Sequence, residues 1–150
     1  MRLTVYTDGS GTTGGPAGIA FVAITDEGEI QTEESLSLAN ATNQQAEILA
    51  AAYALHCIEP GPDILIVSDS EYLVKGWNEY LPVWRNRGWQ KASGGTPKNL
   101  QHWQRLVAAR EPHVAVLFKW TRGHAGTRGN ERADELAGLA RRTAMEGVVA

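Results

Sequence analysis

The first forty residues contain hydrophobic patterns typical of β-strands. Residues 2–7 alternate with a period of two, and residues 17–25 form a more continuous apolar run after a glycine-rich turn. Residues 26–28 (Asp-Glu-Gly) have the composition of a hairpin turn, which leads into a third strand at about residues 29–38. The chain is therefore predicted to open with three antiparallel strands.

Helical periodicity begins after residue 42. Thr42 and Gln45 have the spacing of a capping box, and apolar residues follow at helical intervals, which predicts a helix over residues 43–58. A Pro-Gly-Pro sequence ends this helix. Residues 64–67 (ILIV) then form an apolar run typical of a strand buried on both faces, so this strand is expected at the centre of the sheet.

The remaining pattern predicts two helices, a strand and a final helix. Residues 70–81 have a helical pattern that is expected to end before Pro82, and Asn99 is placed to cap the next helix. Residues 114–120 form the last apolar strand, and residues 130–145 form an alanine-rich helix. This order of elements predicts an α/β fold in which helices cover the faces of a mixed sheet.

Length and composition are those of one globular domain. The chain has 150 residues, of which 43% are hydrophobic and 21% charged, so a single domain is expected over residues 1–145, with 146–150 as a disordered tail. Cys57 is the only cysteine, which excludes an internal disulfide and a thiolate metal site. With no signal-peptide segment and no apolar run of roughly 20 residues, a cytoplasmic location without a membrane partner is expected. The protein is expected to be a monomer.

The positions of the charged residues say more about nucleic-acid binding than the net charge does. The formal net charge of −3 argues mildly against a nucleic-acid-binding protein, because such domains usually carry a net positive charge. The segment 82–98, with the sequence PVWRNRGWQKASGGTPK, has no acidic residue. It combines cationic and aromatic side chains: Trp84, Arg85, Arg87, Trp89, Lys91 and Lys98.

Four carboxylates lie where the predicted elements meet. Asp8 and Asp69 each follow the apolar residues of a strand, at the end where α/β sheets usually bind ligands. Glu47 lies one turn inside the first helix and Asp134 lies in the last helix, and both have alanines beside them that permit close packing on the sheet. Taken singly, a strand-end aspartate often caps a turn and a helical carboxylate is usually solvated. Only their combination points to a function.

Seven stretches, in this order, resemble the type 1 ribonuclease H family, in particular its bacterial members with a basic protrusion. They are YTDGS at 6–10, NQQAE at 43–47, VSDSEYLVKGW at 67–77, RGW at 87–89, WQRL at 103–106, KWTRGHAG at 119–126 and GNERADELA at 129–137. The resemblance covers about residues 1–142. It implies a ribonuclease H-like fold, a five-stranded mixed sheet with helices on both faces. It also implies endonucleolytic hydrolysis of the RNA strand of RNA–DNA hybrids, leaving 5′-phosphate and 3′-hydroxyl ends.

The resemblance assigns roles to five residues. Asp8, Glu47, Asp69 and Asp134 are implied to hold two Mg²⁺ ions in the presence of substrate, with Mn²⁺ as a substitute and Asp8 bridging both ions. Carboxylate oxygens are hard ligands that suit Mg²⁺, which is also coordinated by phosphate oxygens of the substrate. No protein nucleophile is needed. His124 is implied to move protons near the scissile phosphate and to help the product leave. The alternative for a histidine in such a glycine-rich loop is a solvated surface position.

The resemblance also implies contacts with the hybrid. Thr42 is implied to meet a phosphate of the DNA strand at a helix amino terminus, although it also caps that helix. The first turn, Thr12 to Pro16, departs from the Gly-Asn-Pro-Gly of many members, so an asparagine contact there is missing or replaced. The residues implied to lie along the minor groove or at that phosphate are Gly9, Ser10, Gly11, Thr42, Asn43 and Gln44.

The basic segment admits two interpretations. In the first, the four cations Arg85, Arg87, Lys91 and Lys98 follow phosphates, and Tyr80, Trp84 and Trp89 provide packing or a face against deoxyribose. In the second, the segment is a loop pinned by tryptophans, and its cations are merely solvated.

Two other functions remain open at this point. One is another enzyme of the same fold, such as a transposase, an integrase or a junction resolvase, although these usually carry further DNA-binding segments. The other is a hybrid-binding module without catalysis, against which the four carboxylates and His124 speak, because a binder gains nothing from negative charge beside phosphate.

Overall fold

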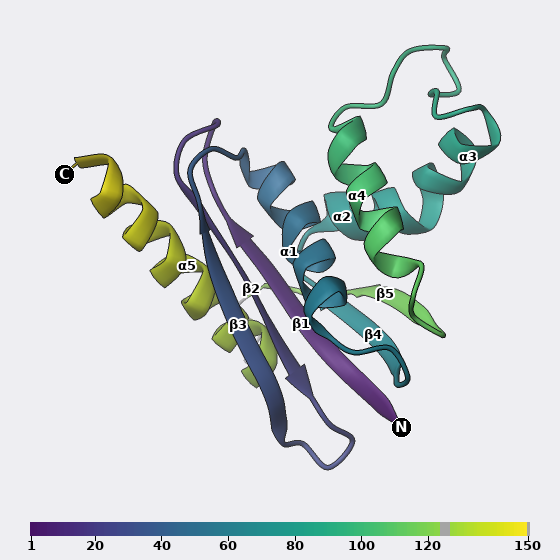
Figure 1. Cartoon of the computed structure of the whole chain (residues 1–150). Helices are drawn as coiled ribbons and strands as arrows, with labels where there is room; N and C mark the ends of the chain where they lie inside the picture. The colour runs from purple at the N-terminus through teal and green to yellow at the C-terminus, as the bar shows by residue number, and fades with distance from the viewer. Residues whose placement is uncertain (124–126, 150) are drawn as a thin grey trace.

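A five-stranded mixed sheet with the strand order β3-β2-β1-β4-β5 forms the centre of the computed structural model, which describes residues 1–123 and 127–149 (Figure 1). The first three strands are antiparallel, and the last two run parallel to β1. Their bounds are β1 (Arg2–Ser10), β2 (Ala17–Ile24), β3 (Ile30–Leu38), β4 (Asp63–Ser68) and β5 (Val116–Trp120). Because β1 and β4 are parallel neighbours, their carboxyl ends meet at one edge of the sheet, and the predicted five-stranded mixed sheet is confirmed.

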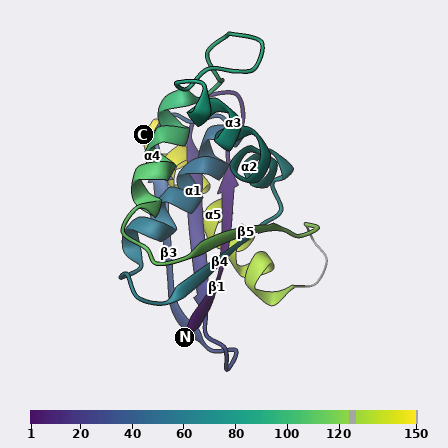
Figure 2. The same cartoon turned by 90° about the vertical axis from the view of Figure 1, so that its right-hand side faces the viewer.

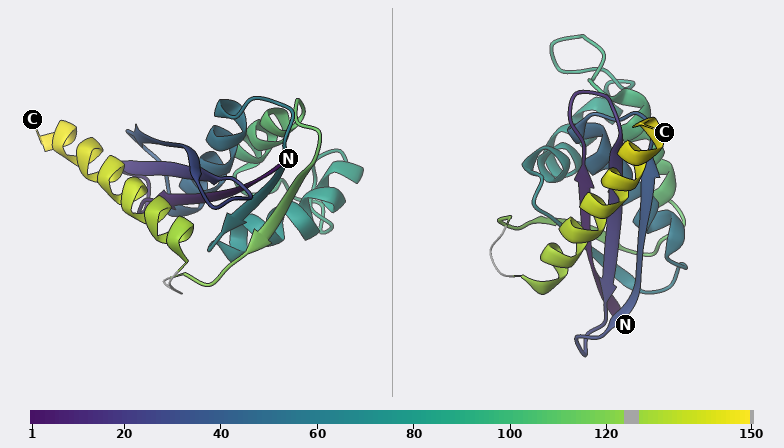
Figure 3. Two further views of the ribbon diagram at one scale, coloured as in Figure 1. Left: turned by 90° about the horizontal axis from the view of Figure 1, so that it is seen from below. Right: turned by 90° about the vertical axis from the view of Figure 1, so that its left-hand side faces the viewer.

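Helices cover both faces of this sheet. On one face α1 (Asn43–Cys57) packs on β1 and β2, and α4 (Leu100–Arg110) packs on α1 (Figures 1 and 2). On the other face the long helix α5 (Arg128–Val149) crosses β1, β2 and β3 (Figure 3). None of the helices in the described ranges is both long and apolar enough to cross a bilayer.

Small residues bring the helices close to the sheet. Five alanines of α1, the helix that packs on β1 and β2, are buried: Ala46, Ala50, Ala51, Ala52 and Ala54. A Cβ atom at Gly9 in β1 would lie 2.5 Å from the carbonyl carbon of Ala46, so only glycine fits where β1 and α1 meet. A Cβ atom at Gly18 in β2 would collide with the backbone of α5 at Ala137. The alanine-rich sequences of both helices thus set how near their carboxylates come to the strand ends.

The helical region after β4 is longer than its sequence predicts. It consists of α2 (Glu71–Lys75), a π-helical turn η1 (Gly76–Tyr80) and α3 (Leu81–Asn86). The prediction that the helix ends before Pro82 is wrong, because Pro82 lies in the first turn of α3, where its missing N–H costs no helical hydrogen bond. The π-helical turn forms where the buried ring of Trp103 fills the space beside Gly76.

Two further features concern helix ends. The last helix runs to Val149, residue 150 lies outside the described residues, and the expected disordered tail at 146–150 stays a prediction. Asn99 precedes α4 as expected, but its side chain makes no capping hydrogen bond. It bonds instead to side chains of two other helices.

Candidate active site

Three of the four predicted carboxylates converge at the edge of the sheet where β1 and β4 end. Asp8 lies near the end of β1, Asp69 follows β4 directly, and Glu47 projects from α1. One carboxylate oxygen of each residue lies within 4.8 Å of those of the other two. The parallel pairing of β1 with β4 and the close approach of α1 therefore produce the cluster that the sequence predicts.

Glu47 is held in place by the backbone of β1. The side chain is 4% exposed, and its Oε1 accepts a hydrogen bond from the backbone N–H of Gly9. Because this N–H belongs to the residue after Asp8, the same part of β1 carries one carboxylate and orients the other.

Asp134 approaches the cluster from α5, on the other face of the sheet. Its side chain is exposed and lies within hydrogen-bonding distance of the Asp8 side chain, so that this contact and the negative charge of Asp134 both act on Asp8. Asp8 is therefore the shared member of the set, with Glu47 and Asp69 acting on it electrostatically as well.

The electrostatics of the cluster favour a bound cation. Burial raises the pKa of Asp8 to about 10, and the negative charges of Glu47 and Asp69 add to this rise. Burial also raises the pKa of Glu47 to about 7, with a contribution from Asp69, against the lowering effect of the Gly9 N–H. Without a compensating positive charge these groups hold protons or repel one another. Converging oxygen ligands of this kind suit a hard divalent cation.

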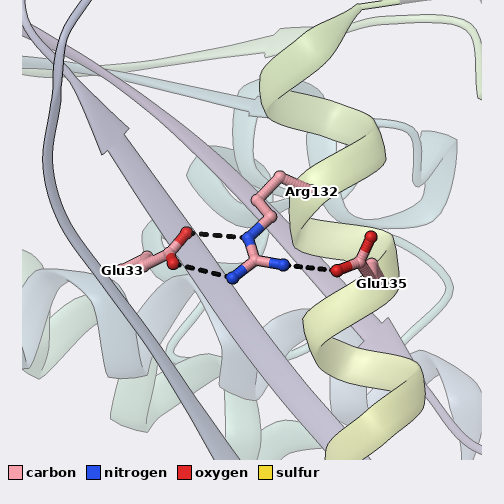
Figure 4. Close-up of polar contacts among 3 residues, drawn as sticks. All are labelled: Glu33, Arg132 and Glu135. Carbon is pink, nitrogen blue, oxygen red and sulfur yellow. Dashed lines mark hydrogen bonds and ion pairs between the residues drawn. The ribbon is translucent and has the colours of Figure 1, made fainter.

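A forked ion pair ties α5 to the edge strand β3 (Figure 4). The Nε and Nη2 atoms of Arg132 lie 3.0 and 2.8 Å from the two carboxylate oxygens of Glu33, and Nη1 contacts Glu135. The hydrogen bonds from Arg132 lower the pKa of Glu33. At the start of the same helix, Gly129 packs against the Tyr6 ring of β1, with no room for a side chain. These contacts hold the turns of α5 that carry Asp134.

His124, the fifth predicted catalytic residue, lies outside the described residues. The preceding Gly123 is described, and a Cβ atom placed on it would lie 3.1 Å from Oδ2 of Asp69. The segment that leads to His124 therefore passes directly beside the carboxylate cluster, and the role of His124 stays a prediction.

The predicted minor-groove residues gather around the amino terminus of α1. The Gly11 N–H lies 3.3 Å from Oδ1 of Asn43, and Thr12 accepts a hydrogen bond of 3.1 Å from the Asn43 N–H. Thr42 caps the helix through a complete capping box with Gln45. Gly9 and Ser10 precede this turn, and Gln44 follows Asn43 in the first turn of α1. The first turn, despite its altered sequence, therefore lies against the helix terminus.

The basic segment is pinned by aromatic packing and exposes its cations. The Trp84 ring meets the buried Trp103 ring edge-on, with centroids 5.9 Å apart, and the half-buried Trp89 donates its backbone N–H to the Trp84 carbonyl. Tyr80 stacks on Trp84 and remains 51% exposed. Four side chains are exposed and form no ion pair with any described residue: Arg85, Arg87, Lys91 and Lys98. Both interpretations of the segment agree with this packing.

A cavity of about 800 Å³ lies between this segment and α2. Lys91 and Lys98 line it together with Lys75, a residue that the sequence analysis did not select. In the sequence, Lys75 is an ordinary polar position on a helix, and only the fold brings it to the other two lysines.

Comparisons with known proteins identify the family. The RNase H model matches residues 1–142. The chain belongs to the RNase H family. The ribonuclease H of Agrobacterium fabrum is 38% identical over 136 residues, which is 91% of this chain and 92% of that protein.

Solved structures agree with this assignment. The LC9 RNase H1, described as a type 1 RNase H with the type 2 active-site motif, is 29% identical, with a TM-score of 0.76 over 95% of this chain and 72% of that one. A foamy viral protease-reverse transcriptase in complex with an RNA/DNA hybrid is 27% identical, with a TM-score of 0.81 over 94% of this chain and 20% of the viral chain. Membership of the RNase H family makes the chain a nuclease, and thus a hydrolase.

Proposed function

We propose that this protein is an endoribonuclease that uses divalent cations to hydrolyse the RNA strand of RNA–DNA hybrids, leaving 5′-phosphate and 3′-hydroxyl ends. The observation that carries the proposal is the convergence of Asp8, Glu47 and Asp69, whose carboxylate oxygens lie within 4.8 Å of one another at the sheet edge. The hybrid-bound reverse transcriptase of similar fold supports the choice of substrate.

The donor set fits Mg²⁺, with Mn²⁺ as a substitute. All four side chains offer carboxylate oxygens, and burial together with the neighbouring carboxylates raises the pKa of Asp8, so a cation held among them would offset the cost of burying their charge. Asp8, which interacts with both Glu47 and Asp134, would hold divalent cations together with those two residues and Asp69. Cations held there would supply the activation of water and the neutralisation of charge on the departing 3′ oxygen.

Backbone and side-chain groups of the protein orient the carboxylates and are proposed to transfer protons. The Gly9 N–H fixes the direction of the Glu47 carboxylate, and the forked pair of Arg132 holds the helix that presents Asp134. His124, whose loop begins beside Asp69, is proposed to take up and release protons near the leaving group. No side chain is required as a nucleophile.

Hybrid binding is assigned to two surfaces. At the amino terminus of α1, backbone N–H groups and the side chains of Thr42, Asn43 and Gln44 face the minor groove and a DNA phosphate, with Gly9, Ser10 and Gly11 beside them. The basic segment supplies exposed cations, which form no ion pair within the part of the chain that the structure describes, for further phosphates, and Tyr80 offers an exposed ring.

A panel of labelled substrates tests the proposal. The protein is incubated with an RNA–DNA hybrid, duplex DNA or duplex RNA in the presence of Mg²⁺ and then of EDTA. Cleavage of RNA in the hybrid alone, abolished by EDTA, is the expected result. Cleavage of duplex DNA would favour another enzyme of this fold, and hybrid binding without cleavage would favour a binding module.

A further inference from the structure

A side chain of the edge strand β5 contacts the backbone of Asp69, one residue beyond the end of β4. β4 ends at Ser68, which pairs with Trp120, the last residue of β5. The indole Nε1 atom of Trp120 donates a hydrogen bond of 3.1 Å to the backbone carbonyl oxygen of Asp69. The contact between the two strands is thus extended by one residue, to the residue that carries a carboxylate of the cluster.

The backbone on either side of Asp69 is fixed by further hydrogen bonds. The Thr121 N–H donates to the carbonyl oxygen of Ser68 at 2.9 Å, and the Ser70 N–H donates to Oγ of the same buried serine at 3.0 Å. The Ser70 side chain also caps α2. Because both neighbours of Asp69 are held, the bond from Trp120 fixes the peptide group between them and restricts the direction of the Asp69 side chain.

The packing of β5 holds Trp120 in turn. The buried ring of Phe118, two residues earlier in β5, stacks on Trp77 of η1 with the ring centroids 4.7 Å apart. The Phe118 carbonyl oxygen accepts a hydrogen bond of 3.1 Å from Nδ2 of Asn78. Trp120 itself is 44% exposed, so its ring adds little to the core, and the bond to Asp69 is the contact that needs an indole N–H.

We propose that Trp120 is a positioning residue for Asp69, which it holds through the hydrogen bond from its indole N–H. The inference rests on the proposed function, in which the Asp69 carboxylate would face a divalent cation. Groups that orient a metal ligand contribute roughly 10–100-fold to metal affinity without touching the metal, because a ligand already in place loses less conformational freedom on binding. Trp120 belongs to the stretch KWTRGHAG, in which the sequence analysis assigned a role to His124 alone.

The first test is the variant Trp120→Phe, which keeps an aromatic ring on β5 and removes the indole N–H. In the free protein, the Mg²⁺ affinity measured by calorimetry is expected to fall about 10-fold. Trp77→Phe is the matched control, because it removes an indole that packs on β5 at Phe118, and its Mg²⁺ affinity should stay within about 2-fold of wild type. An unchanged Mg²⁺ affinity in Trp120→Phe, or an equal loss in both variants, overturns the proposal.

Hybrid cleavage separates a change in the cation site from a change in hybrid binding. In Trp120→Phe, the Mg²⁺ concentration that gives half-maximal cleavage should rise about 10-fold, while KM for the hybrid at saturating Mg²⁺ stays within about 2-fold of wild type. Excess Mg²⁺ should therefore restore most of the turnover. A raised KM for the hybrid with an unchanged Mg²⁺ dependence would place Trp120 in hybrid binding and contradict a positioning role.

Backbone hydrogen exchange tests the same contact without metal or hybrid. The amides of Ser70 and Thr121 both donate to Ser68. In EDTA, Trp120→Phe should increase the exchange of these two amides, and the control Trp77→Phe should not. Unchanged exchange in Trp120→Phe also overturns the proposal. Failure of the wild-type protein to bind Mg²⁺ counts against the proposed function, and the exchange measurement then still decides whether Trp120 fixes this part of the backbone.

Discussion

The backbone N–H of Gly9 donates a hydrogen bond to the carboxylate of Glu47, so the strand that carries one acidic residue of the site also orients a second. This contact requires β1 and α1 to touch, and a Cβ atom at Gly9 would lie 2.5 Å from the Ala46 carbonyl carbon. The position of the Glu47 carboxylate relative to β1 thus depends on residue 9 having no side chain.

Gly9→Ala is expected to separate β1 from α1. Overpacking of this kind costs about 1–3 kcal/mol of unfolding free energy, and activity should fall further than the stability loss explains, because the Glu47 carboxylate moves. Chemical denaturation and hybrid cleavage measure the two effects. Gly15→Ala is the control, since a Cβ atom there meets nothing within 4 Å. Equal behaviour of the two variants would show that the contact is not needed.

Removing Asp8 should stabilise the metal-free protein. Because burial raises the pKa of Asp8 to about 10, the folded state binds a proton that the unfolded state releases, and stability in EDTA falls as pH rises above roughly 4. Asp8→Asn should therefore melt at least about 3 °C above wild type at pH 8, the shift for roughly 1 kcal/mol in a chain of this size. This difference in melting temperature should become smaller as the pH is lowered toward 5, because the wild-type protein is more stable there.

Saturating Mg²⁺ should reduce the difference in melting temperature between Asp8→Asn and wild type, because the cation binds only the folded wild-type site. Asp134→Asn should behave similarly but more weakly, since Asp134 is exposed. Calorimetric melting of the three proteins with and without Mg²⁺ gives the comparison. Equal or lower melting temperatures for both variants in EDTA would mean that the carboxylates do not repel one another in the folded protein.

His124→Ala should affect turnover and spare metal binding. A residue that moves protons contributes roughly 10²-fold to the rate, and one that holds no metal leaves the calorimetric Mg²⁺ affinity unchanged. A loss of metal affinity in this variant would assign His124 as a ligand instead.

The exposed cations of the basic segment should govern the salt dependence of hybrid binding. Each phosphate contact removed should reduce the slope of log affinity against log salt by roughly 0.7–0.9. Neutralising Arg85, Arg87, Lys91 and Lys98 together should therefore flatten the slope and raise KM most at low salt, with little change in turnover. If these cations are only solvated and the tryptophans only pack, the slope will match that of wild type.

The strands and the carboxylates of this fold are readable from the sequence because they follow local rules. Alternating and continuous apolar runs mark the strands, and Asp8 and Asp69 stand at strand ends that parallel pairing brings together. The alanines beside Glu47 indicate close packing of α1 on the sheet, and the resemblance to the type 1 ribonuclease H family is what joined Glu47 to the two aspartates.

What the sequence does not show depends on contacts between distant elements. The π-helical turn before Pro82 lies where the Trp103 ring packs on Gly76, and the side chain of Asn99 bonds to partners 54 and 27 residues away. Lys75 joins Lys91 and Lys98 only because α2 and the basic segment line one cavity. No local pattern records any of these relationships.

The central claim is that a carboxylate cluster with Asp8 as its shared member drives Mg²⁺-dependent cleavage of RNA in hybrids. The most direct test compares Asp8→Asn with Asp63→Asn, a change at the opposite end of the adjacent strand β4, after circular dichroism shows both to be folded. The proposal predicts that Asp8→Asn loses hybrid cleavage in Mg²⁺ and that Asp63→Asn cleaves like wild type. Wild-type cleavage by folded Asp8→Asn would contradict it.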